Sequence, residues 1–386
     1  MEKFGRVMMA LFIGVIVCFV GLPVLFIVAL SGDIHLIGLV LASMISVWLL
    51  YLFSDIGLYK KTNGKKMAAG IIAAILVIGA SFAVPHYYKQ SFAQVDGEVD
   101  LFEYEAFTGS GKLAELDAPA SFKLTADLPR LDGATALYPL YAAFTEAVYP
   151  EGNYPVYDPG FSKVVSTTTP EAYDRLLAGE TDIIFVAGPS SGHQNRAEAK
   201  GLELKMTPIG REAFVFFVNA RNPVDGLSSD EIRSIYSGEV TDWSEFGGKD
   251  DEIRAFQRPV DSGSQTTFIK FMGDTPIEEP EIEEMASGMG GIISEVASYR
   301  NYKNAIGYTF RFFSTEMVRN DKIKLLAIDG VEPSIETIRS DEYPLSSEFY
   351  AVTAGSDNPN VQPFIDWILS EEGQELVERT GFVSIE

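Results

Sequence analysis

Three long uncharged stretches occupy the first 84 residues and set this part of the chain apart from the rest. They span 8–30, 35–53 and 67–84, and each is close to the length that a helix needs to cross about 30 Å of hydrocarbon. A cleaved signal peptide has a shorter apolar stretch, and no small-residue cleavage site follows the first run. The sequence therefore predicts a membrane anchor of three transmembrane helices over 1–84.

Basic residues flank these stretches unevenly. Lys3 and Arg6 precede the first stretch and four lysines lie between the second and the third, whereas the turn between the first two holds only Asp33. Loops rich in Lys and Arg stay in the cytoplasm. We therefore expect a multi-pass plasma-membrane protein with a cytoplasmic N-terminus and with everything from about residue 85 outside the cytoplasm.

The remainder of the chain is strongly acidic and has no cysteine. Residues 85–386 hold 24 Lys and Arg against 51 Asp and Glu, and the one cysteine, Cys18, lies in the first apolar stretch. Such a charge repels nucleic acid and attracts no anion from a distance. With only His35, His86 and His193 in the chain, a histidine-based metal site is disfavoured. We expect no metal, no cofactor and no nucleic-acid partner.

Residues 85–121 are rich in turn formers and predict a stalk or linker, and from residue 122 apolar runs alternate with helical patterns. Strands are expected over 163–166, 181–187, 213–219, 305–309, 324–328 and 348–353. Helices are expected over 134–148, 170–178, 229–237, 266–272, 291–299 and 360–380. This alternation is typical of α/β domains with mainly parallel sheets, where ligands bind at the carboxyl ends of strands.

Three loops rich in hydroxyl groups lead into predicted helices. The first contains Gly133 and Thr135, the second runs from Ser166 to Pro170 with Thr169 as the expected N-cap, and the third joins Arg258 to a Ser-Gly-Ser sequence at 262–264. The first N–H groups of a helix carry partial positive charge and can bind an anion. Serine and threonine also cap helices without any ligand, but three such entries together favour an anion site.

These loops resemble the family of phosphate-binding proteins of phosphate ABC transporters. The resemblance lies in Gly133-Ala-Thr-Ala-Leu-Tyr-Pro and in Arg258 followed by Ser262-Gly263-Ser264, with supporting matches over 227–243, at Ala305-Ile-Gly-Tyr and over 364–374. It covers about residues 125–386. The resemblance implies a two-lobed, type II periplasmic-binding-protein-like α/β fold over 122–386, with lobe one at about 122–210 plus 312–386 and lobe two at about 211–311.

The resemblance also implies a ligand and its contacts. A small oxyanion, phosphate above all, would be bound by a protein that is not an enzyme and that serves an ABC permease. The implied donors are the hydroxyl of Thr135, the backbone of Ala136, a hydroxyl among Thr167, Thr168 and Thr169, and the third-loop residues Arg258, Ser262, Gly263 and Ser264.

One position departs from that family. The family has an aspartate after the strand that matches 181–187, and it accepts the proton of a protonated phosphate, but here Ala187 and Gly188 follow the strand. Asp261 is the candidate replacement, although it could equally cap the helix or hold Arg258. Without an acceptor, discrimination between phosphate and sulfate loses its physical basis.

Two further features of the sequence point to functions other than anion uptake. Residues 188–192 match the G-x-S-x-G pattern of serine hydrolases, but the one histidine beyond Ser190 is His193, which is too close in sequence for a triad. A sensor or regulatory module that signals through the three helices remains an alternative to uptake, because a transport receptor needs only one anchor.

Overall fold

The computed structural model describes residues 94–95, 99–279, 299–300, 303–319, 321 and 323–385. The chain forms two units, Met1–Phe92 and Ala93–Glu386, and the described residues belong to the second. The predicted spans at 8–30, 35–53 and 67–84 lie outside the described residues, and so does the predicted helix at 291–299 except for Tyr299, which is in a strand. Within the described part of the chain, every helix is too short or too polar to cross a membrane.

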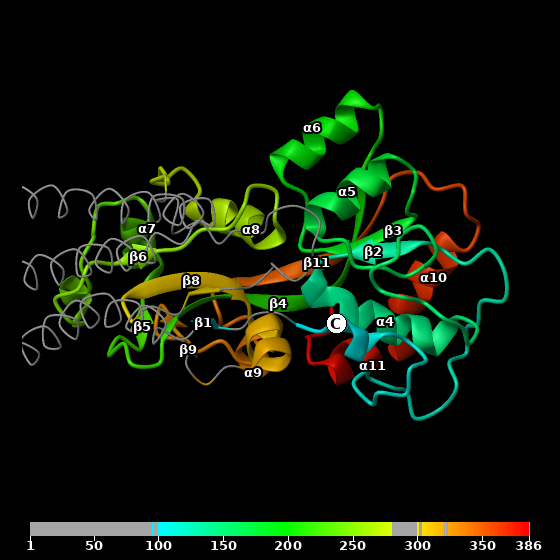
Figure 1. Ribbon diagram of the computed structural model, residues 1–386, viewed down its shortest axis with the longest axis horizontal. Coiled ribbons are helices and arrows are strands. Elements are labelled where there is room, and N and C mark those ends of the chain that lie inside the picture. Colours follow the sequence, from blue (N-terminus) through cyan, green and yellow to red (C-terminus); the bar gives the residue numbers. More distant parts are fainter. Residues whose placement is uncertain are drawn as a thin grey trace, which may run out of the picture. The chain divides into compact units, whose positions relative to one another are not determined.

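One mixed sheet runs through both lobes of the second unit (Figure 1). Its strand order is β2-β3-β11-β4-β8-β6, and β9 also pairs with β4, on the edge opposite β8. The strands are β2 (Leu131–Gly133), β3 (Ile183–Val186), β4 (Lys205–Asn219), β6 (Arg254–Ala255), β8 (Ala305–Phe310), β9 (Ile323–Leu325) and β11 (Ser346–Thr353). Two short pairs stand apart: β1 (Gln94–Val95) with β7 (Tyr299–Arg300), and β5 (Gly226–Leu227) with β10 (Ala327–Ile328).

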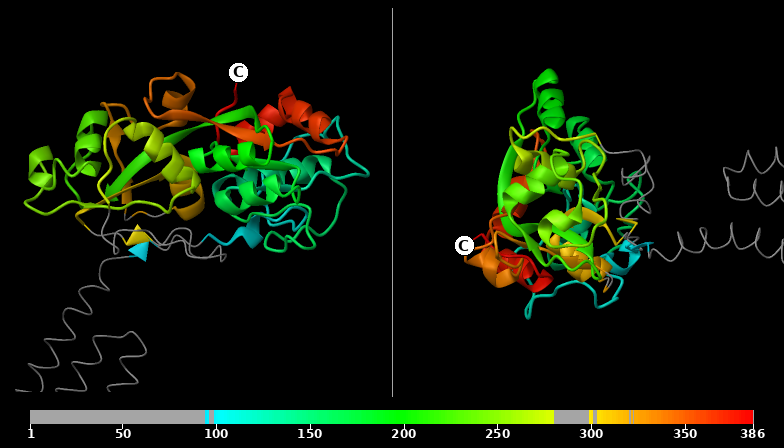
Figure 2. Two further views of the ribbon diagram at one scale, coloured as in Figure 1. Left: turned by 90° about the horizontal axis from the view of Figure 1, so that it is seen from above. Right: turned by 90° about the vertical axis from the view of Figure 1, so that its left-hand side faces the viewer.

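The long strand β4 carries the chain from one lobe into the other. Its first part pairs with β11 as far as Ala213, and its second part pairs with β8 from Phe214 onward. Both ladders are antiparallel, so the expectation of mainly parallel sheets is wrong for the centre of the sheet. Among the described strands, the parallel pairs are β2 with β3, β6 with β8 and β5 with β10. The centre is antiparallel because the chain leaves lobe one along β4 and returns in the opposite direction along β11 (Figure 2).

At the expected boundary near residue 312 the chain contacts the core of lobe one through Phe312, but it then goes back to lobe two. β9 pairs with β4 within lobe two, and Leu326, Ile338 and Tyr343 belong to the core of that lobe. The helix α9 (Ile335–Arg339) lies in this segment. Residues 323–345 therefore belong to lobe two, and β11 begins the second part of lobe one. This pairing depends on contacts far apart in sequence, which the local pattern does not reveal.

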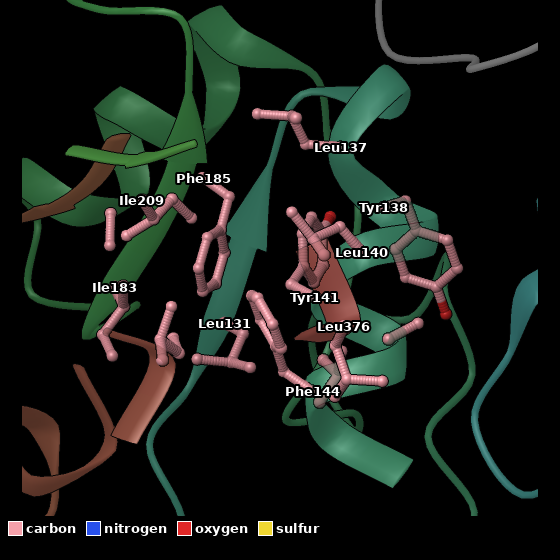
Figure 3. Packing of buried hydrophobic residues seen from close by; sticks show 14 of the residues in the cluster. Leu131, Leu137, Tyr138, Leu140, Tyr141, Phe144, Ile183, Phe185, Ile209 and Leu376 are labelled. Carbon is pink, nitrogen blue, oxygen red and sulfur yellow. The ribbon is translucent and has the colours of Figure 1, made fainter. Parts of the chain in front are cut away.

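The core of lobe one packs helices against β2 and β3 (Figure 3). Tyr141, on α4 (Tyr138–Val148), stacks on Phe185 of β3 with ring centroids 4.9 Å apart. The helices α10 (Val361–Ile368) and α11 (Glu371–Thr380) complete this core. Leu101 and Tyr104 of the 3-10 helix η2 (Leu101–Tyr104) also join it. The described part of the expected stalk, 99–121, is thus packed onto lobe one rather than free of it.

Lobe two has its own aromatic core. Phe268 of α8 (Gly263–Met272) stacks on Tyr308 of β8 at 4.4 Å, and α7 (Ser229–Tyr236) and the 3-10 helix η4 (Trp243–Phe246) pack against the same core. The turn of π-helix at Phe313–Val318 follows β8 and contributes Phe313 to a small cluster with Phe217.

Several predicted elements differ from the observed ones. The strand expected over 163–166 is a single bridge from Val164 to Leu131. The helix expected over 134–148 is divided into the 3-10 turn η3 (Thr135–Leu137) and α4, and the one over 360–380 breaks between α10 and α11. The helix α6 (Ser191–Ala199) was not predicted, because few of its residues are apolar and it lacks an apolar stripe.

Candidate functional site

A cavity of about 170 Å³ lies where the two lobes meet. Helix entries from both lobes and the central strands line it. Its lining residues are Ala134, Thr135, Ala136, Leu137, Thr168, Thr169, Pro170, Ala187, Glu212, Arg258, Pro259, Ser262, Gly263, Ser264, Thr309, Phe310, Phe313, Ser347, Glu348, Phe349 and Phe382. All three loops that the sequence singled out therefore reach one cavity. Of the predicted site residues, Thr167 and Asp261 do not line it.

The helix α8 begins at the cavity with Ser262 as its N-cap. The Ser262 hydroxyl accepts a hydrogen bond from the N–H of Gln265 at 3.3 Å, so Ser262 caps the N-terminus of α8. Its own proton remains available for donation, because a hydroxyl can accept and donate at once. Gly263 and Ser264 line the cavity as the first residues of the helix, where helical geometry leaves backbone N–H groups without an intrahelical acceptor.

Arg258 lines the cavity, and its backbone N–H is bonded to a residue of α8. The Arg258 N–H donates to the side-chain oxygen of Gln265 at 2.9 Å and to the hydroxyl of Tyr308 at 3.2 Å. Tyr308 also donates to the same oxygen of Gln265. Gln265 is buried, so this buried amide fixes the position of the arginine relative to the helix start.

The second loop enters α5 (Thr169–Leu177) one residue earlier than expected. Thr168, not Thr169, is the N-cap, and its side chain makes no capping hydrogen bond. Thr168 has φ 88° and ψ 161°, a region that is costly for residues other than glycine, and such strain persists where the surroundings impose it. A Cβ on Gly263 of α8 would lie 3.3 Å from the Thr169 hydroxyl oxygen, so the N-termini of α5 and α8 come close together at the cavity.

Asp132, which the sequence analysis missed, holds the first two loops together. Its carboxylate accepts hydrogen bonds from the N–H groups of Gly133 and Thr167 and from the Thr167 hydroxyl at 2.8 to 2.9 Å, and from Nε of Arg175 at 3.0 Å. Burial raises the pKa of Asp132 to about 6, and the hydrogen bonds from Thr167 and Gly133 act against that rise. The Thr167 hydroxyl is therefore used within lobe one and does not face the cavity.

Gly133 is needed for strand packing. A Cβ at this position would lie 2.4 Å from the backbone oxygen of Phe185 on the neighbouring strand β3. The backbone of β2 thus approaches β3 closely at Gly133, and Thr135 and Ala136 of η3 follow it at the cavity.

Asp261 does not take the place of the missing family aspartate. Its carboxylate accepts a 2.5 Å hydrogen bond from the Ser190 hydroxyl and two 3.3 Å bonds from the Arg196 guanidinium. Burial alone would raise its pKa, but the Ser190 and Arg196 contacts hold the pKa of Asp261 below its ordinary value. Since Ser190 and Arg196 belong to the α6 region of lobe one and Asp261 precedes α8, this contact joins the two lobes beside the cavity.

Glu212 is the cavity residue that sequence reasoning overlooked. It lies on β4, opposite Ser347 of β11, and only 3% of it is exposed. Burial raises the pKa of the Glu212 carboxyl to about 7. A signal was available, because an ionisable residue directly before the apolar run 213–218 is unusual in a central strand.

The G-x-S-x-G segment has no hydrolase geometry. The hydroxyl of Ser190 donates to Asp261, while Nδ1 of His193 accepts from the Ser190 backbone N–H at 3.1 Å. The His193 ring stacks on Tyr173 at 4.0 Å, and burial lowers the pKa of His193 to about 4. These contacts form a helix cap. Clusters of three or more metal-ligating side chains are likewise absent from the described residues.

A profile described as the PBP superfamily domain matches residues 124–372. The chain belongs to the PBP superfamily. The matched range covers all three loops of the cavity, and the α/β periplasmic-binding-protein-like fold implied by the sequence is confirmed.

Curated relatives of this PBP superfamily chain are named phosphate-binding protein PstS. The protein from Bacillus subtilis is 26% identical over 285 residues, which cover 72% of this chain and 87% of the relative. The protein from Borreliella burgdorferi is 25% identical over 187 residues, covering 47% and 66%. The relatives are binding proteins by name, in agreement with the expectation that this chain is not an enzyme.

Solved structures of the PBP superfamily type are also similar. A putative phosphate ABC transporter substrate-binding protein with bound phosphate from Clostridium perfringens is 24% identical, with a TM-score of 0.49 over 66% of this chain and 98% of that one. An ABC-type phosphate transport receptor from Vibrio cholerae is 17% identical, with a TM-score of 0.44 over 66% and 98%.

Proposed function

We propose that this protein binds phosphate or a similar small oxyanion in the cavity between its lobes and supplies it to an ABC permease. The observation that carries the proposal is the meeting of two helix N-termini, those of α5 and α8, with Arg258 at one cavity. Helix N-termini and a guanidinium are the usual donors to an anion. The names of the curated relatives support the same ligand.

Each lobe supplies part of the donor set. Lobe one provides the start of η3 at Thr135 and Ala136 and the start of α5 at Thr168 and Thr169, whereas lobe two provides Arg258 and the start of α8. An anion held by both sets favours the closed arrangement, because it interacts fully only when the lobes meet. Binding would thereby be coupled to lobe closure, which is what a permease can recognise.

Substitution of Arg258 tests the site. Arg258→Ala should weaken phosphate binding by about 30-fold or more, since loss of one partner of a buried charge pair costs about 2–5 kcal/mol. Arg258→Lys should recover part of the affinity, because lysine restores the charge but not the bidentate fork. The measurement is isothermal titration calorimetry of the purified full chain in non-ionic detergent.

Arg233→Ala is the matched control. Arg233 belongs to α7 of lobe two and pairs with Asp230 and the Phe271 ring, and it does not line the cavity. Its removal should leave the affinity unchanged. Wild-type affinity in Arg258→Ala, or loss of affinity in both variants, would place the anion elsewhere.

The choice among oxyanions should be loose. Ala187 lines the cavity where the family has an acceptor, and the Asp261 carboxylate is occupied by Ser190 and Arg196. Sulfate is expected to compete within about tenfold of phosphate, roughly 1.4 kcal/mol. A phosphate preference beyond a thousandfold in the same titrations would contradict this expectation.

The proposed location is the outer face of the plasma membrane, with 8–30, 35–53 and 67–84 as transmembrane helices and the N-terminus in the cytoplasm. The lysine-rich loop at 60–66 supports this topology. A reporter that is active only in the cytoplasm should work when fused after Lys66 and fail when fused after Ser91. The reverse pattern would overturn the proposed location.

A sensor or regulatory module is the second candidate, favoured by the three apolar stretches where one anchor would suffice for uptake. Deletion of the gene that encodes this chain distinguishes the two candidate functions. Loss of anion uptake supports the transport role, whereas normal uptake with a lost transcriptional or signalling response to the anion supports the sensor.

A further inference from the structure

A buried carboxyl group lies in the wall of a cavity whose other features attract anions. Glu212 is 3% exposed and lines the cavity from β4, the strand that passes between the lobes. An ionised carboxylate repels a bound anion, and the repulsion is strong where water is excluded. Glu212 therefore conflicts with anion binding unless a proton lies between the two groups.

The contacts of Glu212 leave room for such a proton. Oε1 accepts from the Ala213 N–H at 2.8 Å and Oε2 accepts from the Phe312 N–H at 3.0 Å. Each carboxyl oxygen offers two lone pairs, so each can make one more hydrogen bond. The two backbone donors hold the carboxyl group in place and leave one lone pair on each oxygen without a backbone donor.

The charged groups around Glu212 do not remove the conflict. Arg311 lies closest, with Nε 3.5 Å from Oε1, but its other nitrogens bond Gly381 and Thr315, and Glu316 lies 3.9 Å from it. On the cavity wall, Arg258 shares the lining with Glu212 and Glu348. The described lining thus holds one basic and two acidic side chains.

We propose that anion binding is linked to proton uptake, with one proton shared between the Glu212 carboxyl and the bound oxyanion. The proton comes from solvent and no covalent bond to the ligand changes. This inference rests on the proposed function, and it adds that the ligand class is any small oxyanion able to accept this hydrogen bond. A protonated carboxyl donates to sulfate and phosphate alike, which agrees with loose selectivity.

The pH range of the effect follows from the burial of Glu212. Burial raises the pKa of Glu212 to about 7 in the protein without ligand, and a neighbouring anion raises it further because it favours the neutral form. Uptake should approach about one proton per anion near pH 8 and should fall toward zero near pH 5.5, where the group already holds its proton.

Calorimetry in buffers of different ionisation enthalpy counts these protons. Sulfate is the first probe, because it has no titratable proton near neutral pH, and the full chain in non-ionic detergent is titrated at about pH 8 and pH 5.5. We expect uptake of about 0.5 to 1 proton at the higher pH in the parent protein and close to none in Glu212→Gln. Phosphate is the second probe, and its own ionisation cancels between parent and variant.

Glu348→Gln is the matched control. Glu348 lines the same cavity but is exposed, and it accepts a hydrogen bond from Tyr350 at 2.9 Å. This variant removes the same charge from the cavity wall and should take up as many protons as the parent. Glu212→Asp keeps a titratable group at the critical position and should retain an uptake that falls with pH.

The outcomes separate this inference from the proposed function. A parent that binds either anion without proton uptake at about pH 8, or with an uptake that Glu212→Gln keeps, overturns the proton linkage alone. A parent that binds neither anion overturns the proposed function and the linkage with it. The pH profile of the parent is decisive even if Glu212→Gln does not fold.

Discussion

At the scale of single residues, burial and the contacts of each carboxyl group together set the direction of its pKa shift. Asp261 receives hydrogen bonds from a hydroxyl and a guanidinium, and its pKa is lowered. Glu212 receives two backbone N–H bonds but is fully enclosed, and burial raises its pKa to about 7. Asp132, Asp261 and Glu212 are similar carboxylic acids in solution. Beside this cavity, the pKa of Asp261 is lowered and the pKa values of Asp132 and Glu212 are raised.

The raised pKa of Glu212 predicts a pH dependence of stability. The folded value of about 7 lies above the ordinary 4.5, so the folded state binds more protons than the unfolded chain between these values. The free energy of unfolding should therefore fall as pH rises from about 4.5 through 7, by at most about 3 kcal/mol from this group. Urea unfolding of the parent and of Glu212→Gln at a series of pH values measures the effect.

The variant carries no titrating group at this position, so its stability should decline less over the same pH range. Glu348→Gln, which removes an exposed carboxylate, should follow the slope of the parent. Equal slopes for the parent and Glu212→Gln would show that Glu212 ionises as an exposed glutamate does.

At the scale of elements, the site is built from helix starts held by neighbouring strands and loops. The N-terminus of α5 is fixed through Asp132 on β2, and that of α8 is tied to Arg258 through Gln265. The two helices belong to different lobes, and α6 adds the contact from Ser190 and Arg196 to Asp261. This last contact exists only while the lobes are together.

Loss of the Asp261 contact should weaken ligand binding although its carboxylate does not line the cavity. Asp261→Asn keeps a residue that tolerates the left-handed backbone, φ 70°, but loses the charge that Arg196 engages. Affinity for phosphate should fall by up to about 5-fold, since a partly exposed ion pair contributes up to roughly 1 kcal/mol. Calorimetry measures the change.

Asp174→Asn is the control, because Asp174 is the other carboxylate near Arg196 at 3.3 Å and belongs to lobe one. It should leave the affinity close to that of the parent. A matching loss in both variants would mean that Arg196 matters within lobe one and not for closure.

At the scale of the whole molecule, the proposed anion site lies within an acidic protein. Residues 85–386 hold 24 basic and 51 acidic side chains, so the long-range field opposes the approach of an anion. In the proposed site the favourable interactions would come from helix starts and Arg258, and such interactions act over a few ångströms only. Capture therefore depends on local geometry rather than on net charge.

The rate of anion association should rise with ionic strength. Neutral salt screens the repulsion between the acidic surface and an incoming sulfate or phosphate, and the Debye length falls from about 30 Å at 0.01 M to about 10 Å at 0.1 M. Stopped-flow measurements of intrinsic fluorescence at increasing sodium chloride concentration give the rate constant. A constant that falls with salt would show that a local positive potential guides the anion.

The sequence by itself determined the local features of this protein. Strand and helix periods predicted β3, β8, β11, α5, α7 and α8 near their observed bounds, and the entry loops predicted Thr135, Arg258 and Ser262 as neighbours of one cavity. These features depend on residues a few positions apart. The order and spacing of neighbouring residues therefore suffice to predict these features.

Only the tertiary structure decided which distant groups meet. The return of the chain at β11, the Asp261 contact with Ser190 and the donors around Asp132 all join residues far apart in sequence. The position of Glu212 before an apolar run is unusual in sequence, but only the fold places it beside the cavity. The pKa of a carboxyl group is set by burial and by nearby donors, and neither exists before the two lobes are assembled.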